Sequence, residues 1–102
     1  MAERFPARET REVPLHFFAP GAGSVQVAGD FNEWRPESNP LHAGEAGDWS
    51  ATLQLRAGEY QYRYVVDGIW REDPDAHESV ENPFGSRNSL LRVAIDARSD
   101  QL

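Results

Sequence analysis

The chain has 102 residues, enough for one domain, and its 17 acidic and 10 basic side chains give a formal net charge of -7. This charge repels phosphate backbones and anionic membrane surfaces, so we expect neither nucleic acid nor a membrane as a partner. The sequence has no cysteine, no apolar run of transmembrane length and no signal-peptide core in its first residues, which predicts a cytoplasmic location.

Alternating apolar and polar residues dominate the chain, a pattern typical of β-strands, and no stretch has the capped periodicity of a long helix. The first predicted strand covers residues 14–19 and is followed by the turn sequence APGAG. The second covers residues 24–28, where two valines alternate with small or polar residues. Residues 29–47 are rich in turn formers and predict a long connection with one short paired piece near Leu41.

The segment DWSATLQL predicts a strand over residues 48–55 with one face in the core. Trp49 falls in phase with Leu53 and Leu55 on that face. We therefore expect the Trp49 ring to pack in the interior.

The strongest local signal is EYQYRYVVDGIWRED, in which two strand-like runs flank Asp67 and Gly68. This dipeptide accepts the positive φ angles of a type I′ turn and predicts a hairpin. The register pairs Val66 with Ile69, Val65 with Trp70, Tyr64 with Arg71 and Arg63 with Glu72. One face then carries Tyr60, Tyr62, Tyr64, Val66 and Ile69. The other face carries Gln61, Arg63, Val65 and Trp70, so Trp70 is predicted to lie among polar residues.

Residues 73–89 form another long connection, and SLLRVAID predicts a last strand over residues 89–96 with Leu91, Val93 and Ile95 on one side. About seven short strands separated by turns are more typical of an all-β, immunoglobulin-like sandwich than of a closed barrel. The predicted organisation is a polar N-terminal tail over residues 1–12, one domain over residues 13–96 and a polar C-terminal tail over residues 97–102.

Trp34 and Trp70 are the tryptophans that the predicted strands leave without a place in the core. Trp34 follows the turn-forming stretch GDFNE, and Trp70 shares a face with Gln61 and Arg63. Each ring taken alone is explained by packing under a loop. The two together leave more aromatic surface exposed than a monomer normally does, so we interpret them as a binding surface.

A sugar is the ligand that suits two flat indoles, because the C–H face of a pyranose ring packs on the π surface while its hydroxyls bond outward. Arg63 and Asn88 offer the donors and acceptors that the hydroxyls need. Burial of about 100 Å² of apolar surface per ring yields roughly 2 to 3 kcal/mol. After ordering costs, two such rings predict micromolar to millimolar affinity.

Longer motifs cover nearly the whole chain, from about Leu15 to Val93. They are PGAGSVQVAGDFNEW, which follows a pair of phenylalanines, then DW, GEYQYRYVVDGIW, DP and NPFGSRNS. With these motifs the chain resembles the family 48 carbohydrate-binding modules. These are the glycogen-binding domains found in the β subunit of AMP-activated protein kinase and at the front of branching and debranching enzymes.

In that family an immunoglobulin-like sandwich holds α-1,4-glucan. The resemblance implies a site formed by the tryptophans of FNEW and VDGIW, the basic residue of YQYR and three residues of NPFGSRN. On this chain these positions are Trp34, Arg63, Trp70, Phe84, Ser86 and Asn88. The kinase-associated domains usually have lysine, leucine and threonine where Arg63, Phe84 and Ser86 stand. Arginine keeps the charge but changes the bonding geometry.

A second hypothesis is a protein-interaction or scaffold domain of a glucan-metabolising assembly, with weak or no sugar binding. The resemblance motivates it, because some family members are fused to glycosidases and contact the catalytic domain. Under this hypothesis Trp34 and Trp70 are covered by chain or by a partner, such as a glucan-active enzyme or a kinase. The sugar hypothesis instead requires both rings to be exposed and close together.

Catalytic and metal-dependent functions are not predicted. Asp67 is explained by its turn and Asp73 precedes a proline in a loop, so the carboxylates give no acid–base pair. His16, His42 and His77 lack the spacing of metal ligands. We therefore expect no enzymatic activity, no metal and no cofactor.

Overall fold

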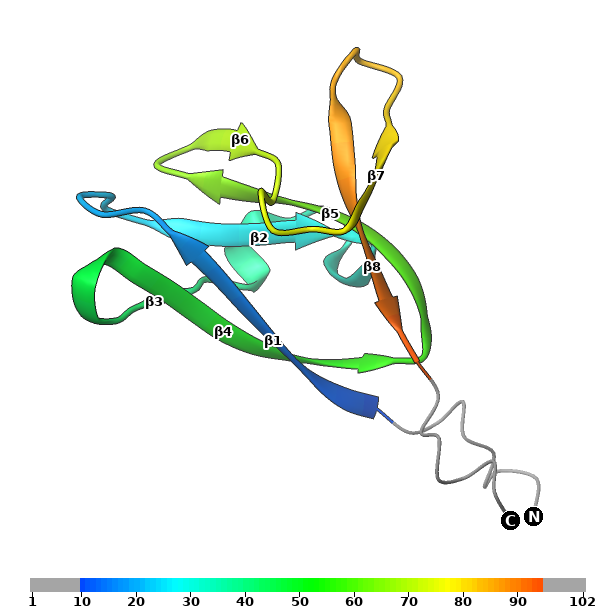
Figure 1. Ribbon diagram of the computed structural model, residues 1–102, viewed down its shortest axis with the longest axis horizontal. Helices are drawn as coiled ribbons and strands as arrows, with labels where there is room; N and C mark the ends of the chain where they lie inside the picture. The colour runs from blue at the N-terminus through cyan, green and yellow to red at the C-terminus, as the bar shows by residue number, and fades with distance from the viewer. Residues whose placement is uncertain (1–9, 95–102) are drawn as a thin grey trace.

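The computed structural model describes residues 10–94, which form two antiparallel sheets (Figure 1). The first sheet has the order β1-β4-β3, with β1 at Thr10–Phe18, β4 at Asp48–Arg56 and β3 at His42–Ala43. The second has the order β2-β5-β8-β7, with β2 at Val25–Gly29, β5 at Gly58–Val66, β8 at Arg87–Val93 and β7 at Glu78–Glu81. β6, Ile69–Arg71, pairs with β5. Short 3-10 helices lie in the loops, η3 at Asp30–Asn32, η4 at Pro36–Ser38 and η5 at Glu45–Gly47.

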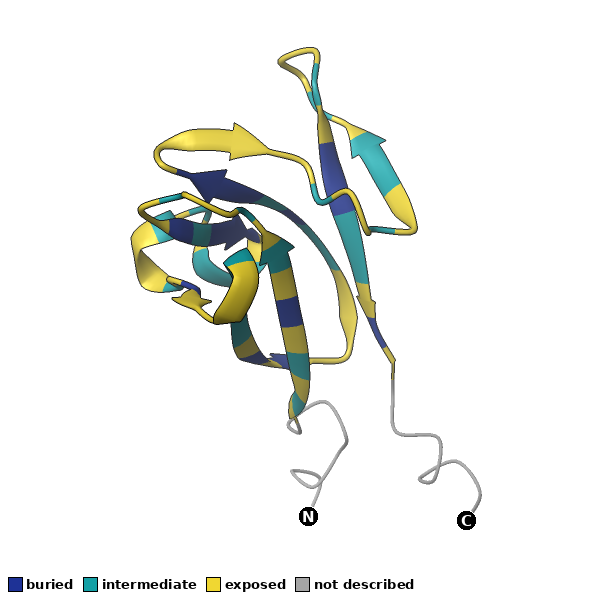
Figure 2. Cartoon of the chain, turned by 60° about the vertical axis from the view of Figure 1, so that its left-hand side comes forward, coloured by how far each residue is buried: buried dark blue, intermediate teal, exposed yellow. Residues whose placement is uncertain are grey.

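The core lies between the two sheets, which confirms the predicted all-β sandwich. Alternation sends every second side chain of a strand inward, and Figure 2 shows this as bands of buried and exposed residues. Trp49 is partly buried against the core, as predicted, and its indole N–H donates to Ala19 O at 3.1 Å. The buried core residues are Leu15, Val25, Val27, Leu41, Leu53, Leu55, Tyr62, Tyr64, Val66 and Val93.

The hairpin between β5 and β6 has the predicted turn. Asp67 and Gly68 have φ angles of 50° and 81°, as a type I′ turn requires. The Asp67 carboxylate also accepts the backbone N–H groups of Gly23 and Ser24 at 2.8 and 2.9 Å. These two bonds tie the turn to the loop before β2.

The predicted hairpin register is confirmed over the length of β6, where Val66 pairs with Ile69, Val65 with Trp70 and Tyr64 with Arg71. The fourth predicted pair, Arg63 with Glu72, does not join the ladder because β6 ends at Arg71.

Two residues of the hairpin do not have the burial that alternation predicts. Ile69, expected on the apolar face, is 58% exposed because β6 is short and no described strand flanks its outer edge. Val65, expected on the polar face, is only 3% exposed because it lies in register between Gln26 of β2 and Trp70 of β6. Burial here depends on position within the sheet as well as on alternation.

The first and last strands differ in extent from the predicted strands over residues 14–19 and 89–96. β1 begins at Thr10, which pairs with Arg56, so residues 10–12 of the predicted N-terminal tail are part of the sheet. These polar residues join because β4 supplies ladder partners for their backbone. β8 ends at Val93. Residues 1–9 and 95–102, which include Ile95 and the predicted tail over residues 97–102, lie outside the described residues.

The connection between β2 and β4 contains the expected short paired piece. Gln26 forms an isolated bridge with Pro40, the next residue Leu41 is buried, and β3 follows directly. On the other side of β4, β1 is an edge strand that pairs with β4 alone among the described strands. Pro14, in the middle of β1, has no backbone N–H and removes one donor from this edge strand.

Candidate functional site

The loop after β2 holds Trp34 in an uncommon backbone conformation. Glu33 and Trp34 both have positive φ angles, 58° and 59°, which residues other than glycine seldom adopt. The Asn32 side chain stabilises the loop, because its Oδ1 accepts the N–H groups of Gly29 and Arg35 at 3.0 and 3.2 Å. The backbone N–H of Trp34 in turn donates to the backbone oxygen of Gly29 at 2.9 Å. The glycine and the asparagine of GDFNEW therefore fix the backbone that carries the indole.

This loop lies tightly against β5. A Cβ added at Gly29 would lie 2.6 Å from Gln61 O and 2.8 Å from Tyr62 Cβ, so the position requires glycine. The carboxylate of Asp30, the next residue, accepts two hydrogen bonds, one from the loop and one from β5. Its Oδ1 accepts the indole N–H of Trp34 at 3.0 Å, and its Oδ2 accepts the backbone N–H of Gln61 at 2.8 Å.

The hairpin brings Trp70 next to Trp34, as the sugar hypothesis requires. The ring centroids are 6.4 Å apart and the ring planes differ by 28°. This separation lies in the range of direct aromatic contact, so the two rings pack against each other. Trp70 is 42% exposed and Trp34 is partly buried, so neither ring belongs to the core.

The loop between β7 and β8 brings a polar cluster to the same place. Asn82 shapes this loop, since its Oδ1 accepts the N–H groups of Phe84 and Ser86 at 2.9 and 3.2 Å. The Ser86 hydroxyl accepts hydrogen bonds from Arg63 Nη1 at 3.0 Å and from Asn82 Nδ2 at 2.9 Å. Arg63 Nη2 donates to Trp70 O at 3.5 Å. Phe84 is 90% exposed.

Asn88, on β8, is only 9% exposed. Its Nδ2 donates to Gln61 Oε1 at 3.0 Å, and its Oδ1 accepts from Asn82 Nδ2 at 3.1 Å. The side chain is thus fixed in orientation, and it keeps one N–H and one lone pair for a further partner.

A groove of about 540 Å³ joins these residues. Of the six predicted site residues, five line it, namely Trp34, Arg63, Trp70, Phe84 and Asn88. The sixth, Ser86, does not line the groove but bonds to two residues that do, Arg63 and Asn82.

Four lining residues were not singled out from the sequence, namely Asp30, Gln61, Asn82 and Pro83. Gln61 shares its face of β5 with Arg63, so strand alternation was a signal that could have found it. Asp30, Asn82 and Pro83 come from loops, whose paths the sequence pattern does not define.

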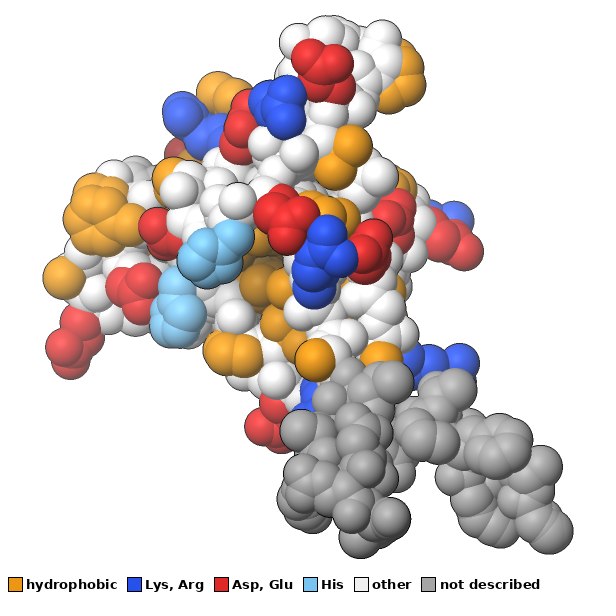
Figure 3. Space-filling model, turned by 45° about the vertical axis from the view of Figure 1, so that its right-hand side comes forward, with side chains coloured by type: hydrophobic (Ala, Val, Ile, Leu, Met, Phe, Trp, Pro, Cys, Tyr) orange, Lys and Arg blue, Asp and Glu red, His pale blue; other side chains and the backbone are white. Residues whose placement is uncertain are grey.

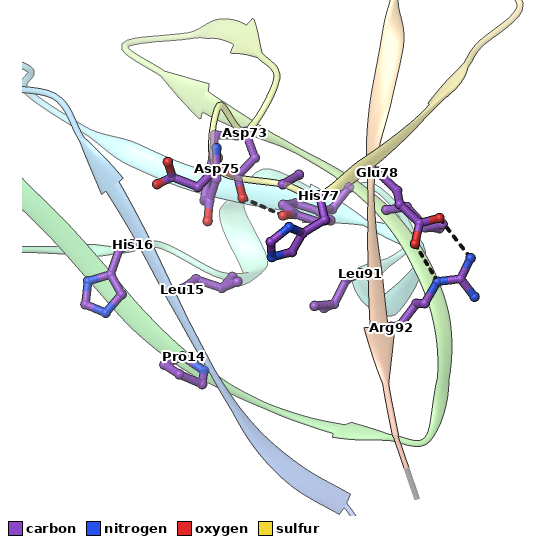
Figure 4. Close-up of a pocket in the computed structure, with 13 residues that line it drawn as sticks. Pro14, Leu15, His16, Asp73, Asp75, His77, Glu78, Leu91 and Arg92 are labelled. Carbon is purple, nitrogen blue, oxygen red and sulfur yellow. Dashed lines mark hydrogen bonds and ion pairs between the residues drawn. The ribbon is translucent and has the colours of Figure 1, made fainter.

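A second hollow, of about 380 Å³, lies on the other face of β5 (Figure 4). Tyr62 and Tyr64, which alternate with the groove residues of that strand, line it. The Tyr62 hydroxyl donates to Asp73 Oδ2, whereas the Tyr64 hydroxyl is buried without a hydrogen-bond partner among the described residues. Burial raises the pKa of both tyrosines, and the nearby Asp73 carboxylate raises it further.

Charged side chains occupy part of the wall of this second hollow. Arg92 Nε and Nη2 each lie 2.9 Å from a carboxylate oxygen of Glu78, and Arg92 also pairs with Glu59. The hydrogen bonds from Arg92 lower the pKa of Glu78. Figure 3 shows acidic, basic and histidine side chains gathered on one face of the molecule with hydrophobic side chains visible between them.

Residues 10–94 contain no group of three histidine or acidic side chains placed to hold a metal ion. Their helices are all too short or too polar to cross a membrane. His16 instead lies 3.3 Å from the Asp48 carboxylate at the surface.

Residues 13–99 match the model of a family described as the glycogen recognition site of AMP-activated protein kinase. The chain belongs to this family. Its members are non-catalytic carbohydrate-binding modules of the family 48 type, as the sequence motifs implied.

Three relatives illustrate the similarity. The chain is 34% identical over 88 residues to 5'-AMP-activated protein kinase subunit beta-2 of Mus musculus, which covers 86% of this chain and 31% of that protein. It is 36% identical over 72 residues to Protein FLOURY ENDOSPERM 6, chloroplastic, of Oryza sativa subsp. japonica, covering 71% and 13%. It is 38% identical over 89 residues to Protein PTST, chloroplastic, of Arabidopsis thaliana, covering 85% and 31%. The chain spans less than a third of the length of each of these relatives.

Proposed function

We propose that this domain binds α-1,4-glucans, such as glycogen and maltooligosaccharides, and has no catalytic activity of its own. The observation that carries the proposal is the pair of near-parallel indoles, Trp34 and Trp70, beside polar side chains in one groove. Membership of the glycogen-recognition family supports the same ligand.

The two indoles are the stacking platforms of the proposed site. A glucose unit packs its C–H face on an indole, and each such contact buries about 100 Å² of apolar surface, worth roughly 2 to 3 kcal/mol. Because Trp34 and Trp70 contact each other, the glucan lies across the pair rather than between the rings. Ordering of the chain reduces the total, so the affinity falls in the micromolar to millimolar range.

Arg63 and Asn88 donate to and accept from the sugar hydroxyls. Each Nη of Arg63 has one protein partner and therefore keeps one N–H, and Asn88 keeps one N–H and one lone pair. Ser86 contributes by holding the guanidinium in place. Phe84, at the tip of its loop, adds an apolar contact at the side of the groove.

The setting we propose is a larger assembly in the cytoplasm, in which residues 13–96 direct a kinase or a glucan-active enzyme to its glucan. The mouse relative is named as a kinase subunit, which supports a partner of that class. The absence of cysteine supports the location, and the net charge of -7 disfavours nucleic acid and anionic membranes. The scaffold hypothesis requires a partner to cover the indoles, because the chain itself leaves Trp70 42% exposed.

Titration with maltoheptaose tests the proposal directly. We expect saturable changes in tryptophan fluorescence and in backbone amide shifts, with the largest shifts around Trp34, Arg63 and Trp70. Cellohexaose, with β-1,4 bonds, serves as a linkage control and is expected to bind more weakly. No response at millimolar maltoheptaose, from protein shown to be folded, contradicts the proposal.

A glycogen-retardation gel tests the two indoles together. The double variant Trp34→Ala, Trp70→Ala is expected to migrate alike with and without glycogen, whereas the native protein is retarded. Phe18→Ala is the matched control, because Phe18 is an aromatic residue that is 68% exposed and lies outside the groove. Equal retardation of the double variant and the native protein removes the indoles from the site.

A further inference from the structure

A chain of hydrogen-bonded residues runs beside the groove from the Trp34 indole to the main-chain carbonyl of Trp70. It starts at the indole N–H of Trp34, passes through the Asp30 carboxylate to the backbone N–H of Gln61, and continues from the Gln61 side chain to Asn88. From there it passes through Asn82 and Ser86 to Arg63, whose Nη2 donates to Trp70 O. Both tryptophans are thus linked to β5, Trp34 through its ring and Trp70 through its backbone.

Trp70 is placed by the sheet itself, since its backbone pairs with Val65 in the hairpin ladder. Trp34 has no such support, because it lies in a loop outside the strands and has a positive φ angle. Its backbone is held through Gly29, and the hydrogen bond of its ring goes to Asp30. The ring also packs beside Trp70, with centroids 6.4 Å apart, but its bond to Asp30 is the one that fixes the direction of its N–H.

Asp30 is itself anchored by the point at which β2 leaves the sheet. Gly29, the last residue of β2, pairs with Tyr62, so the next β5 residue, Gln61, has no β2 partner. The Asp30 carboxylate takes that place and accepts the Gln61 N–H at 2.8 Å. One carboxylate thus satisfies a sheet amide and an indole N–H at the same time.

We propose that Asp30 is a positioning residue of the glucan site, which holds the Trp34 ring beside Trp70 before the sugar arrives. This inference rests on the proposed function. It implies that Trp34 contributes its ring face and not its N–H to the sugar, because that N–H is already bonded. It also implies that part of the ordering cost of binding is met in the free protein, which raises affinity.

The first test uses the native protein without sugar. Hydrogen exchange of the indole N–H groups, followed by NMR, compares Trp34 with Trp70, whose N–H has no acceptor among the described residues. We expect exchange at Trp34 to be about tenfold slower or more. Equal rates at the two indoles overturn the inference.

The second test compares Asp30→Asn with Glu33→Gln. The amide that replaces the Asp30 carboxylate would have only one oxygen for two N–H donors, so one of the two bonds is lost and the link between indole and strand is broken. Glu33→Gln removes the same charge from the same loop, but that carboxylate is 76% exposed and pairs only with Arg35. The control therefore separates the hydrogen bonds of Asp30 from the effect of charge.

For Asp30→Asn we expect Trp34 indole exchange to accelerate and the dissociation constant for maltoheptaose to rise about three- to tenfold. For Glu33→Gln we expect both to stay within about twofold. Unchanged exchange in Asp30→Asn overturns the inference, even with weaker binding, because Asp30 then acts on the sugar and not on the ring. If the native protein fails to bind maltoheptaose, the proposed function fails, while the exchange measurements still decide whether Asp30 holds the ring. If Asp30→Asn does not fold, the native exchange rates alone decide.

Discussion

The groove and the second hollow lie on opposite faces of β5 and use aromatic rings in opposite ways. In the groove, Trp34 and Trp70 leave ring surface accessible, and polar side chains surround them. At the hollow, the rings of Tyr62 and Tyr64 belong to the core and are 4% and 0% exposed. The groove is the larger space, about 540 Å³ against about 380 Å³, but the feature that supports ligand binding there is its accessible flat aromatic surface.

Gly29→Ala is the substitution that we expect to disturb the groove side of β5 most. The new Cβ would lie 2.6 Å from Gln61 O and 2.8 Å from Tyr62 Cβ, so the groove loop and β5 must move apart. We expect the free energy of unfolding to fall by about 1 to 3 kcal/mol or more, and glucan binding to weaken. Urea denaturation measures the first effect. Gly23→Ala is the control, because its Cβ would meet only the Asp67 carboxylate, at 3.3 Å; equal losses in the two variants contradict the explanation.

Trp70→Ala separates binding from stability on the groove side. We expect the affinity for maltoheptaose to fall by roughly 1 to 3 kcal/mol, as for stacking of an aromatic ring under a base. The free energy of unfolding should change much less, because the ring is 42% exposed. Calorimetric titration and thermal unfolding of the same variant give both values. Native affinity in this variant removes Trp70 from the site.

Removal of the tyrosine hydroxyls tests the second hollow. Here we expect changes in the free energy of unfolding without changes in glucan affinity, the opposite of the result expected for Trp70→Ala. Tyr62→Phe takes a hydrogen bond from Asp73, so we expect a loss of about 1 kcal/mol in the free energy of unfolding. Tyr64→Phe removes a buried hydroxyl that has no partner among the described residues, so we expect no loss or a gain of up to about 1 kcal/mol. Maltoheptaose affinity should stay native in both. Weaker binding in either variant shows that the two faces of β5 are coupled.

The smallest effect is expected at the wall of the hollow. Arg92→Gln removes the hydrogen bonds that lower the pKa of Glu78, so that pKa should rise toward its ordinary value. A lowered pKa in the folded state contributes stability above the ordinary glutamate range, and the contribution is lost as the pH falls through the folded-state pKa. The variant and the native protein should therefore converge in stability at acidic pH. NMR titration of the Glu78 carboxyl carbon measures the pKa, and an unchanged value contradicts the assignment.

The sheet side of the groove could be predicted from the sequence because its geometry is local. Asp67 and Gly68 define the turn, the turn defines the register, and the register places Trp70 two residues away from Arg63 along the ladder and on the same face. Alternation then separates the core tyrosines from the groove residues. None of these steps needs a contact between distant parts of the chain.

The loop side of the groove could not be predicted in the same way. Asp30 reaches Gln61 because β2 ends at Gly29, and Asn82 reaches Asn88 because its loop folds back on β8. Both depend on where a strand stops and not on a repeating pattern. The exposure of Ile69 was missed for a related reason, since alternation does not show how far the opposite sheet or a flanking strand extends.

Pro14 has a consequence for the proposed function. If many copies of the domain bind the outer chains of one branched glucan, their local concentration on its surface is high. Under such crowding, an uninterrupted strand edge would template edge-to-edge aggregation of neighbouring copies. Pro14 takes one donor out of the edge strand β1, which disfavours such pairing between copies.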